Sequence, residues 1–232
     1  MAADIVMDVK ALKASGIIPQ KDRELYTIRV QVVGGHLTSA HLAALAAIAE
    51  KYGRGRVHLT TRQGMEIPDV HGRDLEALRR DLAAAGLRLA PGGNRVRGIV
   101  ACPGGHCRCG LIDPQVLARK LSESIGSREG LPHKFKVSIT GCPNSCAKPQ
   151  ENDLGVMGTK DGLAVFVGGR VGKHPRWADR LPVLAKDDEM LLRMANAVID
   201  WYIANGATKE RLGATIERVG LASLEKSLAS LG

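Results

Sequence analysis

The chain has 232 residues, enough for one large domain or two small ones. Hydrophobic residues make up 44% of it but aromatic residues only 3%, so we expect an aliphatic interior, and no apolar run is long enough to span a bilayer. The formal net charge of +9 calls for an anionic partner, but the scarcity of stacking side chains and of Lys/Arg tracts argues against nucleic acid.

The first part of the chain is expected to form a small sheet with helices packed on one side. Its predicted elements are a helical lead-in over 8–15, a strand over 26–33, a helix from Thr38 or Ser39 to Gly53, strands over 57–60 and 65–67, and a helix over 74–86. Residues 90–93, Ala-Pro-Gly-Gly, interrupt the pattern. We therefore place a domain boundary there and predict domains over 1–90 and 91–232.

Two local details of these helices are also predicted. The helix that ends at Gly53 should bury a stripe of Leu42, Leu45, Ile48 and Ala49, because these residues recur at helical spacing. Asp74 should cap the next helix.

The second part again mixes strands and helices, so the fold class is α+β. Its predicted elements are strands over 99–101 and 134–140, a helix starting at Asp113-Pro114, a hairpin over 154–169 that turns at Asp161-Gly162, and helices over 187–205, 208–218 and 221–231. The terminal helices are expected to cover the core.

All five cysteines lie within a quarter of the chain, and each group follows a β-branched strand; they are Cys102, Cys107, Cys109, Cys142 and Cys146. Disulfides are disfavoured because the number is odd and the N-terminus lacks a signal-peptide pattern, so a reducing, cytoplasmic location is expected. Zinc normally uses Cys-x2-Cys pairs, whereas these are spaced x4 and x3. Inert buried thiols would not gather beside Gly and Pro. An iron-sulfur cluster held by four thiolates is the remaining interpretation.

Four motifs in these segments resemble those of the siroheme-containing sulfite and nitrite reductases. They are T-T-R-Q at 60–63, A-C-P-G-x-x-C-R-x-G-x-x-D at 101–113, L-P-x-K-F-K at 131–136 and T-G-C-P-N-x-C at 140–146. The resemblance covers nearly the whole chain and is nearest to the small, assimilatory-type sulfite reductases. It implies a ferredoxin-like half-domain followed by a domain that binds siroheme and a 4Fe-4S cluster.

The resemblance also implies the cluster ligands, namely Cys102, Cys107, Cys142 and Cys146. The family spaces its first pair as Cys-x5-Cys, whereas Cys107 follows Cys102 after four residues and Cys109 follows it after six. We favour Cys107, since the following R-x-G-x-x-D then keeps the family's register. Cys109 remains the alternative.

Further site residues are carried over from the family's motifs. Thr61, Arg62, Gln63 and Asn144 are expected to contact siroheme, and Cys146 to bridge the cluster and the siroheme iron. Arg29, Arg97, Lys134 and Lys136 are expected to bind the substrate anion. By pattern alone, a surface charge on an edge strand is favoured for Arg29 and a surface salt bridge for Arg62. A solvated strand face would explain the two lysines equally well.

The resemblance predicts an oxidoreductase that reduces sulfite to sulfide at a siroheme coupled to a 4Fe-4S cluster. The sequence has no dinucleotide-binding, P-loop or additional cluster motif, so electrons should come from a separate, acidic donor protein such as ferredoxin. Reduction of nitrite to ammonia, a non-catalytic electron-transfer or siroheme-handling subunit, and a zinc-dependent nucleic-acid binder are the alternatives. Only one copy of the motifs is present, so we also expect two chains to associate as a homo-oligomer that completes or shields the cofactor site.

Overall fold

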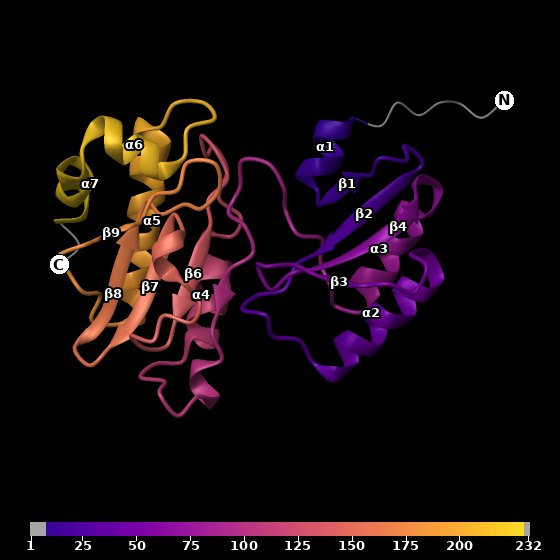
Figure 1. Cartoon of the computed structure of the whole chain (residues 1–232), viewed down its shortest axis with the longest axis horizontal. Coiled ribbons are helices and arrows are strands. Elements are labelled where there is room, and N and C mark those ends of the chain that lie inside the picture. The colour runs from indigo at the N-terminus through magenta and orange to yellow at the C-terminus, as the bar shows by residue number, and fades with distance from the viewer. Residues whose placement is uncertain (1–7, 230–232) are drawn as a thin grey trace. The chain divides into compact units, whose positions relative to one another are not determined.

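The computed structural model describes residues 8–229, and the chain divides into two compact units between Gly93 and Asn94 (Figure 1). The last predicted helix was drawn to residue 231, and its final two positions lie outside the described residues. Within residues 8–229 no helix is both long enough and apolar enough to cross a membrane.

The first unit is a four-stranded antiparallel sheet in the order β1-β2-β4-β3. Its elements are α1 (Val9–Ala14), β1 (Ile17–Pro19), β2 (Leu25–Val30), α2 (Ser39–Tyr52), β3 (His58–Leu59), β4 (Met65–His71) and α3 (Leu75–Ala84). Ile28 and Ile67 from the sheet are buried with Leu45 of α2 and Leu78 of α3 in one core. Helices therefore cover one face of the sheet, as the pattern predicts, and alternate residues such as Arg29 lie on the other face.

Three local predictions for this unit are wrong. The strand ends at Val30, because the Gln31 N–H donates to the Arg88 carbonyl instead of to a strand partner. Leu42 is 48% exposed, so the buried stripe of α2 is narrower than predicted and consists of Leu45, Ile48 and Ala49. Asp74 precedes α3 but makes no side-chain cap hydrogen bond, since its backbone is already helical.

The second unit is a five-stranded mixed sheet in the order β5-β6-β7-β8-β9, with β5 to β7 parallel. Its elements are β5 (Val100–Ala101), α4 (Pro114–Ile125), β6 (Val137–Thr140), β7 (Leu154–Thr159), β8 (Gly162–Val167), β9 (Asp179–Arg180), α5 (Asp188–Asn205), α6 (Leu212–Val219) and α7 (Leu221–Leu228). Every residue of β6 is buried, as expected for a parallel strand covered on both faces.

Strand β6 separates two different layers. On the helical side, the Phe135 ring just before the strand lies 6.2 Å from the Tyr202 ring of α5, centroid to centroid. On the opposite side, the Ser138 hydroxyl donates to the Ala147 carbonyl. The segment 141–153, which links β6 to β7, therefore crosses back over this face of the sheet.

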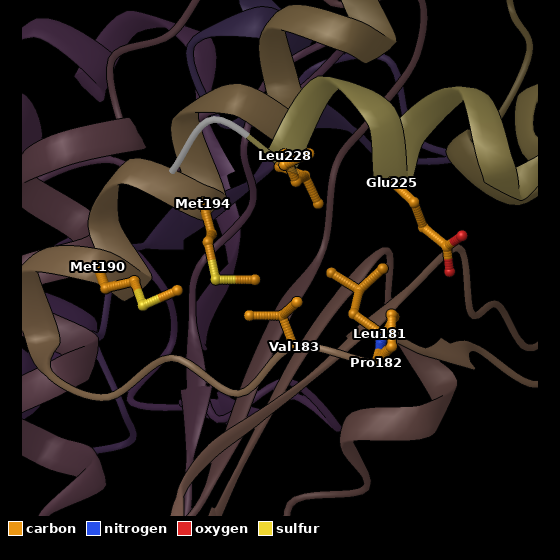
Figure 2. Close-up of a pocket in the computed structure, with 8 residues that line it drawn as sticks. Leu181, Pro182, Val183, Met190, Met194, Glu225 and Leu228 are labelled. Atoms are coloured by element: carbon orange, nitrogen blue, oxygen red, sulfur yellow. The ribbon is translucent and has the colours of Figure 1, made fainter. Parts of the chain in front are cut away.

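An apolar pocket of about 260 Å³ lies between α5, α7 and residues 181–183 (Figure 2). Met190, Met194, Leu181, Val183 and Leu228 supply most of its wall, and Glu225 stands at its edge. None of the predicted site residues lines it. A site for a small anion needs convergent polar groups, so this pocket does not meet that requirement.

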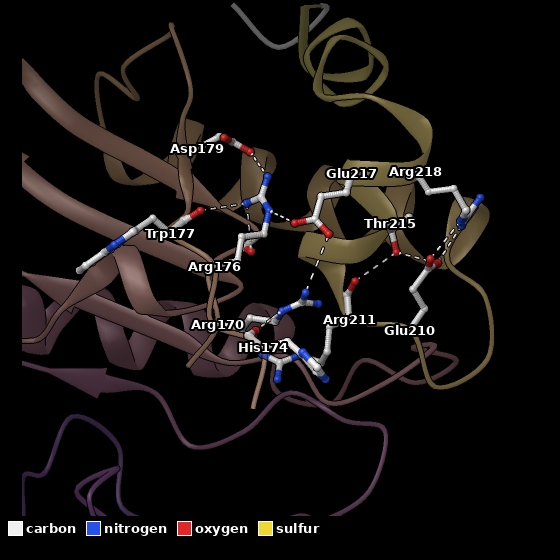
Figure 3. A network of polar contacts seen from close by, with 11 residues as sticks. Arg170, His174, Arg176, Trp177, Asp179, Glu210, Arg211, Thr215, Glu217 and Arg218 are labelled. Carbon is white, nitrogen blue, oxygen red and sulfur yellow. Dashed lines mark hydrogen bonds and ion pairs between the residues drawn. The ribbon is translucent and has the colours of Figure 1, made fainter. Parts of the chain in front are cut away.

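The N-terminal end of α6 is held by a polar network (Figure 3). The Glu210 carboxylate accepts hydrogen bonds from Arg218, at 2.9 and 2.7 Å, from the Thr215 hydroxyl at 3.0 Å and from the Ala207 N–H at 2.8 Å. The Arg218 guanidinium is the main reason that the pKa of Glu210 falls from 4.5 to about 2. The loop between α5 and α6 is thus tied to the helix that follows it.

Replacing the cap of α4 should destabilise the second unit. The Asp113 carboxylate accepts hydrogen bonds from the Gln115 and Val116 N–H groups at 2.9 and 3.3 Å, so Asp113→Ala should lower the free energy of unfolding by about 1 kcal/mol. Asp74→Ala is the matched control and should change it by less than about 0.5 kcal/mol, because Asp74 caps nothing. Urea denaturation of both variants measures the difference, and equal losses would contradict the assigned cap.

Glu210→Gln should destabilise the protein in a pH-dependent way. The folded pKa lies below the ordinary value, so the ionised carboxylate stabilises the fold above about pH 4.5, and this contribution is lost as the pH falls towards 2. Allowing for the half-exposed Arg218, we expect a loss of about 1–2 kcal/mol at pH 7 that shrinks between pH 5 and pH 3. Urea denaturation across this range tests it. Glu123→Gln, on the exposed side of α4, is the control, and a loss independent of pH would refute the electrostatic origin.

Candidate metal and anion site

The two cysteine segments meet because β5 and β6 are parallel neighbours. Val100 pairs with Ser138 and Ala101 with Ile139, so Cys102 and Cys142 both follow the carboxyl ends of adjacent strands. The Cys102 Sγ accepts the Gly141 N–H at 3.1 Å and lies 3.7 Å from the Thr140 hydroxyl. Metal binds the thiolate form of cysteine, whose sulfur can accept hydrogen bonds from such donors.

Glycines make this close approach possible. A Cβ atom at Gly110 would stand 2.0 Å from the Gly104 carbonyl oxygen, and one at Gly141 would stand 3.1 Å from the Gly104 Cα. The two cysteine segments are therefore packed backbone against backbone. Amide groups held this close to sulfur are what an iron-sulfur cluster requires.

The remaining thiols lie at the surface. Cys102 and Cys142 are 9% and 7% exposed, whereas Cys107, Cys109 and Cys146 are exposed. Among residues 8–229, no three Cys, His, Asp or Glu side chains stand close enough together to hold one metal ion. The chemistry of the donor set fits a 4Fe-4S cluster, but sharing one cluster requires the exposed thiols to close on the buried pair.

Cys146 lies on the segment that crosses the sheet. Ser145 adopts a φ of +58° at the turn before it, and the Ser145 hydroxyl donates to the Gln150 side chain at 2.8 Å. Ala147, the next residue, is bonded to Ser138 in the middle of β6. Cys146 is therefore positioned over the sheet, between the edge that carries Cys142 and the opposite end of β6.

Lys134 and Lys136 lie at that opposite end, on either side of the buried Phe135. The Phe135 carbonyl accepts the Arg97 N–H at 2.8 Å, and its N–H donates to the Arg95 carbonyl at 3.1 Å, which fixes an extended backbone. In an extended segment alternate residues share a face. Lys134 and Lys136 therefore lie on the same side as Ser138, which is the side crossed by the Cys146 segment.

Two residues that the sequence did not single out hold this region in place. Asp153 is fully buried, and its carboxylate accepts Arg211 Nη2 at 2.6 Å, Arg211 Nε at 3.1 Å and the Lys136 N–H at 2.8 Å. Arg211 is separated from Asp153 by 58 residues, and no motif links the two. A buried carboxylate that accepts two hydrogen bonds from one arginine holds both side chains in a defined orientation. This pair anchors the backbone of Lys136.

The electrostatics of this cluster favour an anion. Burial lowers the pKa of Lys134, and the neighbouring Arg211 and Arg97 lower it further. Burial also lowers the pKa of His133, helped by Lys134 and Arg211. Burial raises the pKa of Asp153, and Arg211 opposes that rise. Several cations thus stand in mutual repulsion, which a bound anion would relieve.

Of the other predicted residues, Asn144 is exposed in the turn between Cys142 and Cys146, and the rest lie in the first unit. Arg29 of β2 forms a 2.7 Å ion pair with Glu66, its cross-strand partner on β4, and its side chain is 40% exposed. The T-T-R-Q segment is a tight turn between β3 and β4, in which the Thr60 hydroxyl accepts the N–H groups of Arg62 and Gly64 at 3.4 and 3.0 Å. Gln63 has a φ of +58° in this turn. Thr61, Arg62 and Gln63 are consecutive in a constrained loop, so their side chains are presented from a fixed backbone.

Comparison with known proteins identifies the family. A model of the nitrite and sulphite reductase 4Fe-4S domain matches residues 92–230, and one of the nitrite/sulfite reductase ferredoxin-like half domain matches residues 18–85. The chain belongs to the nitrite and sulphite reductase family, which confirms the resemblance drawn from the motifs. Membership implies a siroheme and a 4Fe-4S cluster as its cofactors.

Individual relatives include both kinds of reductase. The chain is 35% identical over 185 residues to a chloroplastic ferredoxin-nitrite reductase of Zea mays, covering 74% of this chain and 32% of that protein. It is 38% identical over 137 residues to a coenzyme F420-dependent sulfite reductase of Methanocaldococcus jannaschii, covering 58% and 22%. The chain thus spans about a third or less of the length of these relatives.

The fold is found in solved structures as well. The Mycobacterium tuberculosis NirA protein superposes with a TM-score of 0.84 at 20% identity, covering 94% of this chain and 45% of that one. This agreement confirms the predicted α+β class, with a ferredoxin-like half-domain followed by a 4Fe-4S domain.

Lys134→Ala should raise the pKa of His133. The substitution removes a neighbouring positive charge and opens the site to water, and both changes favour protonated histidine. The pKa should stay below its ordinary value because the ring remains partly buried and because Arg211 and Arg97 remain. Titration of the histidine ring protons by NMR in the cofactor-free chain measures it. Lys160→Ala, in the exposed β7–β8 turn, should leave the pKa unchanged; a fall in the Lys134 variant would refute the assigned repulsion.

Proposed function

We propose that this chain binds siroheme and a 4Fe-4S cluster and reduces sulfite to sulfide. The observation that carries the proposal is the group of cations at Arg97, Lys134, Lys136 and Arg211, beside the strand that leads to Cys142 and Cys146. Sulfite carries more negative charge than nitrite, so a site with several cations supports it as the substrate.

Different residues of the chain would hold the cluster and the siroheme. Cys102, Cys107, Cys142 and Cys146 would hold the cluster, with Cys146 shared with the siroheme. Arg62 would bind the siroheme carboxylates in a forked, two-bond contact, with Thr61, Gln63 and Asn144 as further hydrogen-bonding partners. The cofactors supply the electron chemistry when bound, and the protein supplies orientation and charge.

Lys134 is suited to give a proton to the substrate. Its pKa is lowered by burial and by two arginines, which makes the ammonium a better acid than an exposed lysine. Lys136 would hold a substrate oxygen, since its backbone is fixed by Asp153. Arg29 and Arg97 would balance the remaining negative charge. Fixed cations of this kind stabilise charge that develops on oxygen as S–O bonds break.

An acidic, separate electron-donor protein completes the proposal. The relatives include ferredoxin-dependent nitrite reductases, and the chain's net charge of +9 suits an acidic partner such as a ferredoxin. We also propose a cytoplasmic location, because free thiols are typical of that reducing compartment. Association of two chains would supply a second copy of the motifs. Gel filtration that gives a fully active monomer would exclude it.

Nitrite reduction is the second candidate, because the maize relative is named for it. Titration of the reduced, cofactor-loaded protein with each anion separates the two. Faster turnover and tighter binding with sulfite support the proposal, whereas a preference for nitrite would make nitrite the substrate. A coloured protein that turns over neither anion would indicate a non-catalytic subunit, and a colourless zinc protein would exclude both reductases.

Lys134→Ala and Lys136→Ala should each lower sulfite turnover by about 10²–10³-fold while leaving siroheme and iron content unchanged. Both side chains are expected to act on the anion and not on the cofactors. Steady-state rates and metal analysis of the same preparations test this. Lys160→Ala is the control, and a parallel loss of cofactor and activity would instead assign the lysines a structural role.

Replacing single cysteines should distinguish the ligands. Cys102→Ser, Cys107→Ser, Cys142→Ser and Cys146→Ser should each lose cluster iron and acid-labile sulfide, because four thiolates hold one cluster. Cys109→Ser should retain both. Iron and sulfide analysis measures the outcome, and a loss in the Cys109 variant with retention in the Cys107 variant would exchange their roles.

A further inference from the structure

The loop between β8 and β9 exposes a large aromatic side chain next to uncompensated positive charge. Trp177 is 70% exposed and Val171 is 53% exposed, in a chain with only two tryptophans. Lys173 and His174 are exposed in the same loop, and Arg180 is exposed in β9, which follows it. We call these five residues the 171–180 surface.

Hydrogen bonds and ion pairs hold the loop beneath this surface. Arg170 and Arg176 exchange two backbone hydrogen bonds of 2.9 Å, which close the loop, and the Arg170 side chain donates to the His174 carbonyl at 2.8 Å. Arg176 forms ion pairs with Asp179 at 2.5 Å and Glu217 at 3.0 Å. The Trp177 side chain points away from this network (Figure 3). Contacts that hold a loop in one conformation lower the entropic cost of presenting its side chains to a partner.

The ion pairs leave the outer charges uncompensated. The carboxylates of Asp179 and Glu217 are taken up by Arg176, and Glu217 also lies 3.8 Å from Arg170. In the described part of the chain, neither Lys173 nor Arg180 forms an ion pair. The surface is therefore net positive around an exposed tryptophan, which fits the anchor-and-rim arrangement of a protein interface.

The loop is also connected directly to the segment that carries Cys146. The Ala178 N–H, next to Trp177, donates to the Gln150 carbonyl at 2.9 Å, and the Gln150 side chain accepts the Ser145 hydroxyl at 2.8 Å. Ser145 precedes Cys146 in the chain. Two hydrogen bonds thus join the residue after Trp177 to the residue before Cys146, which the proposed function places between the cluster and siroheme.

We propose that the 171–180 surface is the docking site for an acidic electron-donor protein, with Trp177 as the anchor and Lys173 and Arg180 as the steering charges. This inference rests on the proposed function, in that electrons arriving here are used at the cysteine site. Charge complementarity selects an acidic donor over a second copy of this basic chain, whose like charge would repel.

The test compares two electron sources on the cofactor-loaded protein. Reduced acidic 2Fe-2S ferredoxin must dock, whereas reduced methyl viologen, a small cation, need not. Trp177→Ala and the double variant Lys173→Glu/Arg180→Glu should raise the KM for ferredoxin at least about tenfold. Turnover with viologen should stay unchanged. The double variant should also weaken the dependence of the ferredoxin KM on salt.

Lys160→Glu is the control for each of the two charge reversals, since it makes one such reversal on an exposed turn outside this surface. An unchanged ferredoxin KM in both test variants overturns the proposal. So does an equal loss of viologen turnover, which would place the loop in the catalytic site, and so does a change confined to self-association measured by ultracentrifugation. If the wild-type protein reduces neither anion with viologen, the proposed function fails instead. In that case calorimetric titration with ferredoxin tests the docking site without any turnover, and the same variants must weaken ferredoxin binding.

Discussion

The parallel pairing of β5 with β6 is the constraint on which the site depends. It places two cysteine segments, 40 residues apart in sequence between Cys102 and Cys142, at one edge of a sheet. Their contact is then fixed by amide-to-sulfur hydrogen bonding and by glycines that admit no side chain. Because β6 is buried on both faces, this edge cannot shift without loss of the core.

The same strand organises the charge of the site. Its carboxyl end leads to cysteines and its amino end to lysines, and the segment bearing Cys146 crosses between them. Asp153 joins the two halves of this arrangement, since it directly precedes β7 and holds both Lys136 and Arg211. A single buried carboxylate thus holds the backbone of Lys136 and the side chain of Arg211.

The sequence predicts much of this architecture. Local signals determine the helices, because caps such as Thr38 and Asp113 and the apolar spacing of Leu75, Leu78 and Leu82 lie within a few residues of each other. The cysteine, T-T-R-Q and L-P-x-K-F-K motifs identify the family. Whether those residues perform the assigned roles stays a prediction. The ends of strands are predicted less accurately, since β2 ends where the Gln31 N–H donates to the distant Arg88 carbonyl.

Residues that act through long-range contacts had no signal in the sequence. Arg211 is an ordinary arginine before a helix, and only the fold brings it to Asp153. The exposure of Trp177 is likewise decided by the ion pairs beneath its loop. Such features depend on which surfaces pack together, and periodicity reports only that a surface is apolar or polar.

The strand order of the second unit also determines when the cofactor can be acquired. Cys102 and Cys142 come together only when β6 has paired beside β5, across a connection that contains α4 and must close a long loop. Cys102, His106, Cys107 and Cys109 lie within eight residues, so they are available to a metal ion before Cys142 has been synthesised. On the proposed set of ligands, a complete cluster site exists only once this strand pairing has formed.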